Sequence, residues 1–185
     1  MKIQSVFLDR DGVLNTHLPG AYVRNSKELA VVPGVAVAIR RLNDKGVPVV
    51  VVSNQQGVSK GLMTFDDLLA VQKELERRLS DEAGARIDAW YYCTDLASVG
   101  SHRRKPMPGM LYEAASDLKL DLSRSVFIGD SPTDIAAGIA APVGATVLVL
   151  SGATRAYHPD TFKPAPQHVF ATLQDAVDRI IEDTL

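Results

Sequence analysis

The chain has 185 residues, of which 46% are apolar and 23% charged, and its 20 basic and 22 acidic residues leave a formal net charge of −2. This balance is typical of a globular protein and excludes disordered and collagen-like chains. A net charge so close to zero also provides no basic field that would attract nucleic acid or an anionic membrane. We therefore expect a single domain over residues 1–185, a monomer with no nucleic-acid or membrane partner.

Cysteine content and the N-terminal sequence indicate the cellular compartment. Cys93 is the single cysteine, which excludes an intramolecular disulfide and leaves too little sulfur for a thiolate zinc site. The first residues lack the regions of a signal peptide, and no apolar run reaches membrane-spanning length. These features favour a cytoplasmic protein.

Apolar runs alternate along the chain with stretches of helical spacing. The apolar runs predict strands over residues 3–8, 47–52, 87–92, 125–128 and 145–150. Helical spacing predicts helices over residues 35–45, 65–79, 110–119, 132–141 and 173–183. Residues 157–168 are expected to form a surface loop. The alternation predicts a doubly wound, three-layer α/β/α sandwich with a mainly parallel sheet.

Polar residues directly follow three of these strands. Asp9, Ser53 and Asp130 each come after an apolar run. Ligands of doubly wound sheets bind beyond the carboxyl ends of the strands. We therefore expect the three side chains to meet in one crevice.

The first of these positions carries two carboxylates, Asp9 and Asp11, followed by Gly12. One carboxylate can attack phosphorus and form an acyl phosphate. The other can protonate the leaving oxygen and later activate water. The motif taken alone also fits an Asp-Gly turn with two solvated acids.

A second acid pair, Asp130 and Asp134, follows the strand over residues 125–128. Carboxylate oxygens suit magnesium, so Asp9 and Asp130 are expected to bind it with the Asp11 carbonyl. An isolated pair of this kind also fits helix capping.

A phosphate beside several carboxylates needs a nearby cation. Lys105 is the candidate, and Arg104 next to it offers a bidentate fork. The alternative for this segment is a solvated basic loop. Ser53, with the polar residues that follow it, could donate hydrogen bonds to phosphate oxygens.

The combined motifs resemble the haloacid dehalogenase (HAD) phosphatase superfamily. They are Phe7 to Gly12, Val52 to Gln55, Arg104 to Pro106, and Gly129-Asp130 through Asp134. Further matches resemble its branch of heptose bisphosphate and histidinol phosphatases. These are Asn15, Tyr22-Val23, Pro33 to Val35, Ser53 to Gly57, Lys60-Gly61 and Arg104 to Met110.

The resemblance implies roles for individual residues. Asp9 is then the nucleophile, Asp11 the general acid and base, and Ser53 and Lys105 bind phosphate. Magnesium is implied at Asp9, Asp11 and Asp130, with Asp134 in support. Substrate contacts are expected from Asn54, Arg104, Asn15 and Gln55. The branch also implies a minimal cap.

The chain departs from this branch at one loop. Many of its members carry a zinc-binding loop of cysteines and a histidine before the Arg-Lys-Pro segment, whereas residues 93–104 hold only Cys93 and His102. Zinc is therefore not expected.

The leading hypothesis is a magnesium-dependent phosphatase that acts on a small phosphorylated metabolite, D-glycero-D-manno-heptose 1,7-bisphosphate, at its 7-phosphate. The alternatives are a histidinol-phosphate phosphatase, a polynucleotide 3′-phosphatase and a non-catalytic phosphate-binding protein.

Overall fold

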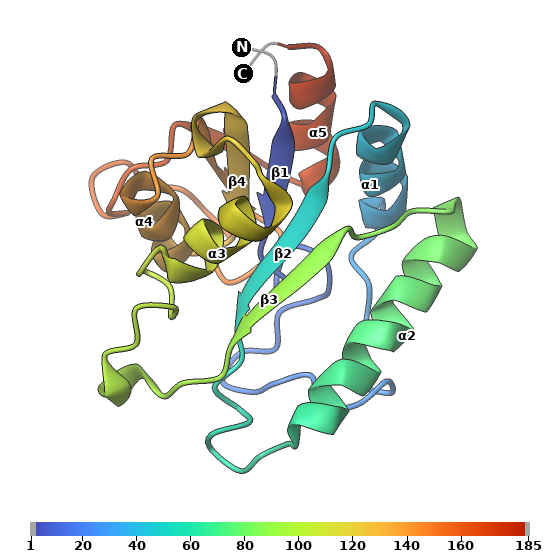
Figure 1. Ribbon diagram of the computed structural model, residues 1–185, viewed down its shortest axis with the longest axis vertical. Helices are drawn as coiled ribbons and strands as arrows, with labels where there is room; N and C mark the ends of the chain where they lie inside the picture. The colour runs from blue at the N-terminus through green and yellow to red at the C-terminus, as the bar shows by residue number, and fades with distance from the viewer. Residues whose placement is uncertain (1–2, 184–185) are drawn as a thin grey trace.

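A six-stranded sheet forms the centre of the computed structural model, which describes residues 3–183 (Figure 1). Every neighbouring pair of its strands is parallel, and the order is β3-β2-β1-β4-β5-β6. The chain thus begins in the middle of the sheet and extends it first to one side and then to the other. The strands are β1 (Ser5–Leu8), β2 (Val49–Asn54), β3 (Ala89–Cys93), β4 (Ser125–Gly129), β5 (Ala145–Val149) and β6 (His168–Phe170).

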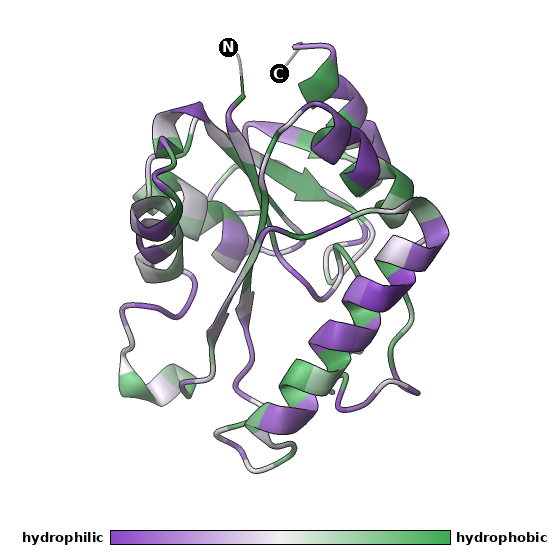
Figure 2. Ribbon diagram, turned by 45° about the vertical axis from the view of Figure 1, so that its right-hand side comes forward, coloured by the Kyte–Doolittle hydropathy of each residue, from purple (hydrophilic) through white to green (hydrophobic). Residues whose placement is uncertain are grey.

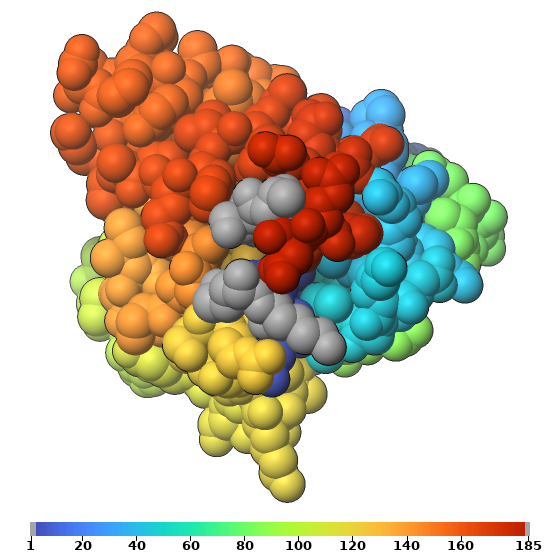
Figure 3. Space-filling model, turned by 90° about the horizontal axis from the view of Figure 1, so that it is seen from above, coloured from blue at the N-terminus to red at the C-terminus, as the bar shows by residue number. Residues whose placement is uncertain are grey.

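Helices cover both faces of this sheet. Figure 1 shows α1, α2 and α5 on one face and α3 and α4 on the other. Figure 3, which looks onto the N-terminal ends of the strands, shows α5 in red beside the blue-to-cyan segment that includes α1. The predicted three-layer α/β/α sandwich is confirmed. The helices are α1 (Val35–Asp44), α2 (Phe65–Ala83), α3 (Gly109–Leu118), α4 (Pro132–Ala140) and α5 (Leu173–Ile181), with short 3-10 helices η1 (Ala97–Val99) and η2 (Leu122–Arg124).

The apolar core lies in two parts because successive strand residues point to opposite faces of the sheet. On β1, Val6 and Leu8 pack into the cluster under α1, α2 and α5, whereas Phe7 packs into the cluster under α3 and α4. All three side chains are fully buried. Full burial of such a side chain contributes about 1.5–3 kcal/mol. The strand that carries the candidate nucleophile is therefore fixed from both sides.

The helix α2 has clear sequence signals at both ends. The Thr64 side chain accepts a hydrogen bond from the Asp67 backbone N–H, and the Asp67 carboxylate accepts one from the Thr64 backbone N–H, a capping box. Gly84 ends the helix in the left-handed region at a φ of 64°. Figure 2 shows hydrophobic and hydrophilic residues alternating along it, as expected for one buried face.

The structure differs from the sequence prediction near the C-terminus. Within residues 157–168, which we expected to be a loop, His168 begins the short strand β6 on the edge of the sheet. Three residues are too few to show the alternation that reveals a strand. Within residues 3–183, no helix combines the length and the apolar character needed to cross a membrane.

Candidate active site

Three strand ends converge at the carboxyl edge of the sheet. Asp9 follows β1, Ser53 and Asn54 end β2, and Asp130 follows β4. Together with Asp11, they line a hollow of about 190 Å³. The rest of its lining consists of His17, Leu18, Ala21, Tyr22, Val23, Ser131 and Ala153. The expectation that these strand-end residues share one crevice is confirmed.

Three carboxylates gather beside this hollow. One oxygen each from Asp9, Asp130 and Asp134 lies within 4.8 Å of the others. Burial, together with the negative charges of the neighbouring carboxylates, raises the pKa of Asp9 to about 6 and that of Asp130 to about 8. Such a group is stabilised by a cation, and its donors are all oxygen, which fits magnesium rather than a softer metal.

The Asp11 carboxylate is not a member of this cluster among the described residues. The Asp11 carboxylate accepts hydrogen bonds from Arg10, Asn15 and Gln55, and Asp134 completes the group of three instead. The predicted contribution of the Asp11 backbone carbonyl stays a prediction.

Backbone groups and glycines hold Asp130 and Asp134 in place. Asp134 caps α4: one of its carboxylate oxygens accepts hydrogen bonds from the Asp130 N–H at 3.2 Å and the Ser131 N–H at 3.1 Å. The Ala153 N–H donates to Asp130 Oδ2 at 2.6 Å. A Cβ atom at Gly152 would overlap this oxygen.

Lys105 supplies the positive charge of the site. Its side chain is 3% exposed, and Nζ lies 2.9 Å from Asp9 Oδ1 and 2.7 Å from Asp134 Oδ1. Nζ also donates to the Val52 carbonyl at 2.9 Å. Burial alone lowers the pKa of Lys105, but Asp134 and Asp9 raise it above its ordinary value. The lysine is therefore an ammonium ion. It is buried in the site, which excludes the alternative of a solvated basic loop.

Asn54 fixes the backbone of Lys105. Its Nδ2 donates to the Lys105 carbonyl at 2.9 Å, and its Oδ1 accepts from the Lys105 N–H at 3.0 Å. Asn54 also lines the hollow, so its predicted substrate contact stays a prediction. Arg104 does not belong to the lining among residues 3–183, and its Nη1 donates to the Asp95 carbonyl at 3.2 Å.

Asp11 is held from behind by residues that do not line the hollow. Gln55 and Asn15, which we expected to contact substrate, are fully buried and donate to the Asp11 carboxylate at 2.7 and 2.9 Å. Burial raises the pKa of Asp11, but Arg10 and these hydrogen bonds bring it below its ordinary value. Asp11 therefore rests as a carboxylate.

Sequence reasoning missed Gly152 and Ala153. Both follow β5, so their position after a strand end was an available signal, but neither carries a functional group on its side chain. Ala153 acts through its backbone N–H. Gly152 acts through the space that its missing Cβ leaves.

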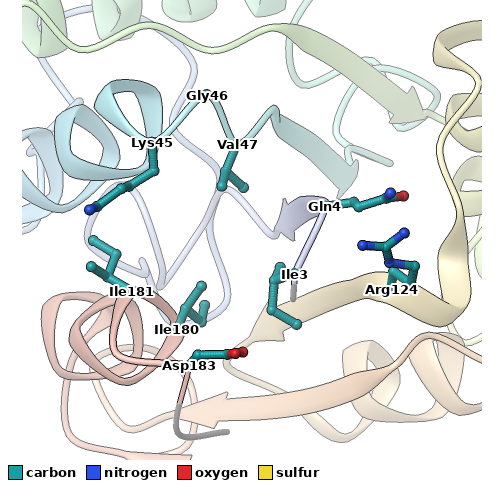
Figure 4. Close-up of a pocket in the computed structure, with 9 residues that line it drawn as sticks. All are labelled: Ile3, Gln4, Lys45, Gly46, Val47, Arg124, Ile180, Ile181 and Asp183. Carbon is teal, nitrogen blue, oxygen red and sulfur yellow. The ribbon is translucent and has the colours of Figure 1, made fainter. Parts of the chain in front are cut away.

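A larger hollow of about 640 Å³ lies at the opposite end of the strands (Figure 4). Figure 4 shows Ile3 and Ile180 beside it, with Lys45 and Asp183 at its margin. It contains no cluster of acids among the described residues. Reaction chemistry is therefore assigned to the smaller hollow at the carboxyl edge.

Comparison with known proteins agrees with this assignment. Residues 102–176 match the family model for HAD-hydrolase-like proteins. A D-glycero-D-manno-heptose-1,7-bisphosphate 7-phosphatase of Thermosynechococcus vestitus is 44% identical over 141 residues, which cover 71% of each chain. The D-glycero-β-D-manno-heptose-1,7-bisphosphate 7-phosphatase of Rhodopseudomonas palustris is 38% identical over 75% of this chain and 79% of its own.

A solved structure extends the similarity to the whole fold. The D,D-heptose 1,7-bisphosphate phosphatase of B. bronchiseptica, in complex with magnesium and phosphate, superposes with a TM-score of 0.90 at 30% identity. The match covers 98% of this chain and 99% of the other. The chain therefore belongs to the HAD hydrolases, in their family of D-glycero-D-manno-heptose-1,7-bisphosphate 7-phosphatases.

Proposed function

We propose that the protein is a magnesium-dependent phosphatase that forms a phosphoryl intermediate on Asp9 and removes the 7-phosphate of D-glycero-D-manno-heptose 1,7-bisphosphate. The observation that carries this proposal is the position of Asp9. Its carboxylate ends the central strand, faces the hollow, and lies 2.9 Å from a buried ammonium group. Names of the relatives support the choice of substrate.

In the first step, an Asp9 oxygen attacks phosphorus as the bond from phosphorus to the sugar oxygen breaks. Asp11, a carboxylate in the free protein, takes up a proton as the negatively charged phosphate binds beside it and donates this proton to the leaving oxygen, so the sugar departs as an alcohol. Lys105 offsets the negative charge of Asp9 and phosphate and keeps both in contact. A magnesium ion held by Asp9 and Asp130 supplies further charge neutralisation when it is bound.

In the second step, water attacks the phosphoryl group on Asp9. The Asp11 carboxylate takes a proton from this water, the bond between Asp9 and phosphorus breaks, and inorganic phosphate leaves. Asp9 returns as a carboxylate and Asp11 in its protonated form, so both residues are ready for another cycle. The Ser53 hydroxyl lies at the same strand end and is available to the phosphate oxygens.

The test compares Asp9→Asn with wild type on heptose 1,7-bisphosphate, histidinol phosphate and an aryl phosphate. Asp9→Asn is expected to lose turnover of all three by several orders of magnitude, because it removes the nucleophile. Asp66→Asn, an exposed position on α2, is the matched control and should keep wild-type turnover. Substrate labelled with ³²P should leave a hydroxylamine-sensitive label on Asp9.

Two results would contradict the proposal. A wild-type enzyme that turns over without any trapped label on Asp9 would exclude the mechanism. A heptose bisphosphate that is hydrolysed no faster than the aryl phosphate would exclude the assigned substrate, and preference for histidinol phosphate would replace it.

A further inference from the structure

Arg10 is a fully buried arginine beside the candidate acid and base. Its side chain has no exposed surface. Its Nη2 donates to Asp11 Oδ1 at 3.0 Å, to Asp11 Oδ2 at 2.9 Å and to Gln55 Oε1 at 3.2 Å. Within residues 3–183, Nη2 thus makes all the hydrogen bonds of this side chain.

The burial of Arg10 is poorly explained by stability. Its Nε and Nη1 are buried without a hydrogen bond to any residue in the range 3–183. An unpaired buried donor costs about 1–3 kcal/mol, and a buried ion pair contributes little net stability because both charges lose water. An apolar side chain would fill this place at lower cost, so the guanidinium serves another purpose.

That purpose is indicated by the contacts of Asp11. Each of its oxygens accepts two hydrogen bonds: Oδ1 from Arg10 and Asn15, and Oδ2 from Arg10 and Gln55. The donors come from separate parts of the chain, since Gln55 follows β2 and the others follow β1. The Asp11 side chain keeps 26% of its surface exposed and lines the hollow. Its direction is therefore fixed while its open side faces the hollow.

We propose that Arg10 is a positioning residue that, together with Asn15 and Gln55, aims the Asp11 carboxyl group at the oxygen between sugar and phosphorus. The inference rests on the proposed function, in which Asp11 gives its proton to that oxygen as the bond to phosphorus breaks. Arg10 does not touch the substrate. Its effect on the reaction is carried entirely by Asp11.

This role predicts a dependence on the leaving group. A sugar alcohol leaves poorly without a proton, whereas p-nitrophenolate leaves without one, so misplacement of the acid slows the sugar substrate selectively. A merely structural role of Arg10 would disturb Asp9 and Lys105 as well and slow both substrates equally. The readout is the first-turnover rate of ³²P transfer to Asp9, which precedes any role of Asp11 as a base.

The principal variant is Arg10→Met, which removes the donors and keeps an unbranched stem. We expect its first-turnover rate with the heptose bisphosphate to fall about 10–100-fold, part of the 10²–10⁴-fold that a general acid contributes. The fold-reduction in rate with p-nitrophenyl phosphate should be at least ten times smaller. Arg10→Lys should restore part of the difference. Arg40→Met, at an exposed arginine of α1, is the matched control and should change neither rate.

A second variant covers the case in which Arg10→Met does not fold. Asn15→Leu is close in size and removes one donor to Asp11, together with a 3.2 Å hydrogen bond from the same nitrogen to the Thr16 carbonyl. The Asn15 Oδ1 atom that it also removes accepts no hydrogen bond among the described residues. Asn15→Leu should likewise slow the heptose bisphosphate more than p-nitrophenyl phosphate, by about three- to tenfold. In an Asp11→Asn background, neither variant should add a further loss.

The outcomes separate this inference from the function on which it rests. Equal losses with both substrates, or full additivity with Asp11→Asn, would overturn the positioning role while label on Asp9 still supported the phosphatase mechanism. Absence of label on Asp9 in the wild-type enzyme would overturn the mechanism itself, and the positioning role with it.

Discussion

Replacement of Lys105 by methionine tests how the acid cluster is held together. Methionine keeps the unbranched stem and removes the charge. In the wild-type structure Nζ lies 2.9 Å from Asp9 Oδ1 and 2.7 Å from Asp134 Oδ1, and all three side chains are largely buried. Lys105→Met leaves both carboxylates without their ammonium partner.

The expected effect follows from these distances. At an effective dielectric constant of about 20, each contact corresponds to about 6 kcal/mol of attraction before the loss of hydration is counted. Dehydration of the charges cancels much of this, and removal of one partner from a buried pair costs about 3–5 kcal/mol. We expect Lys105→Met to lower the free energy of unfolding at pH 7 by this amount.

The measurement is urea unfolding followed by far-UV circular dichroism, at pH 7 with a chelator. Lys73→Met, at an exposed lysine of α2, is the control and should change the free energy of unfolding by less than about 0.5 kcal/mol. A loss at Lys105 no larger than in this control would refute the reasoning, because it would mean that the three carboxyl groups need no cation.

Two further predictions concern the carboxylates. Gly152→Ala places a Cβ against Asp130 Oδ2 and should weaken magnesium binding at least tenfold and cost about 1–3 kcal/mol of stability; unchanged magnesium titration would contradict this. In metal-free protein, burial raises the pKa of Asp9 from 3.8 to about 6 and that of Asp130 to about 8, so the folded state binds more protons than the unfolded state in this range. The free energy of unfolding should therefore fall as pH rises from about 4 to 8, and it should fall less in Asp130→Asn. Urea unfolding of both proteins at several pH values measures this. An Asp130→Asn protein whose free energy of unfolding falls as steeply as that of wild type would contradict the assignment.

The sequence was sufficient to predict five of the six strands and the edge of the sheet that carries the site. Asp9, Ser53 and Asp130 follow strongly apolar runs, and parallel strands bring their carboxyl ends to one edge, so local pattern and topology agree. Lys105 was predicted from the need for a cation near the acids, and its contacts with Asp9 and Asp134 match that need.

What the sequence did not reveal depends on side-chain direction and backbone contacts. The motif that contains Asn15 and Gln55 marks them as site residues, but only the packed structure shows that they turn away from the hollow towards Asp11. Ala153 contributes a backbone N–H, which any residue other than proline possesses. Such contributions cannot be predicted from the residue type.

The paired hydrogen bonds between Asn54 and the backbone of Lys105 have a consequence for how the family can diversify. The segment from Thr94 to Arg104 is anchored at its far end to a strand of the sheet, so insertions, deletions or exchanged residues within it need not displace the ammonium group. The length and sequence of this segment can thus change while the phosphoryl-transfer chemistry stays the same.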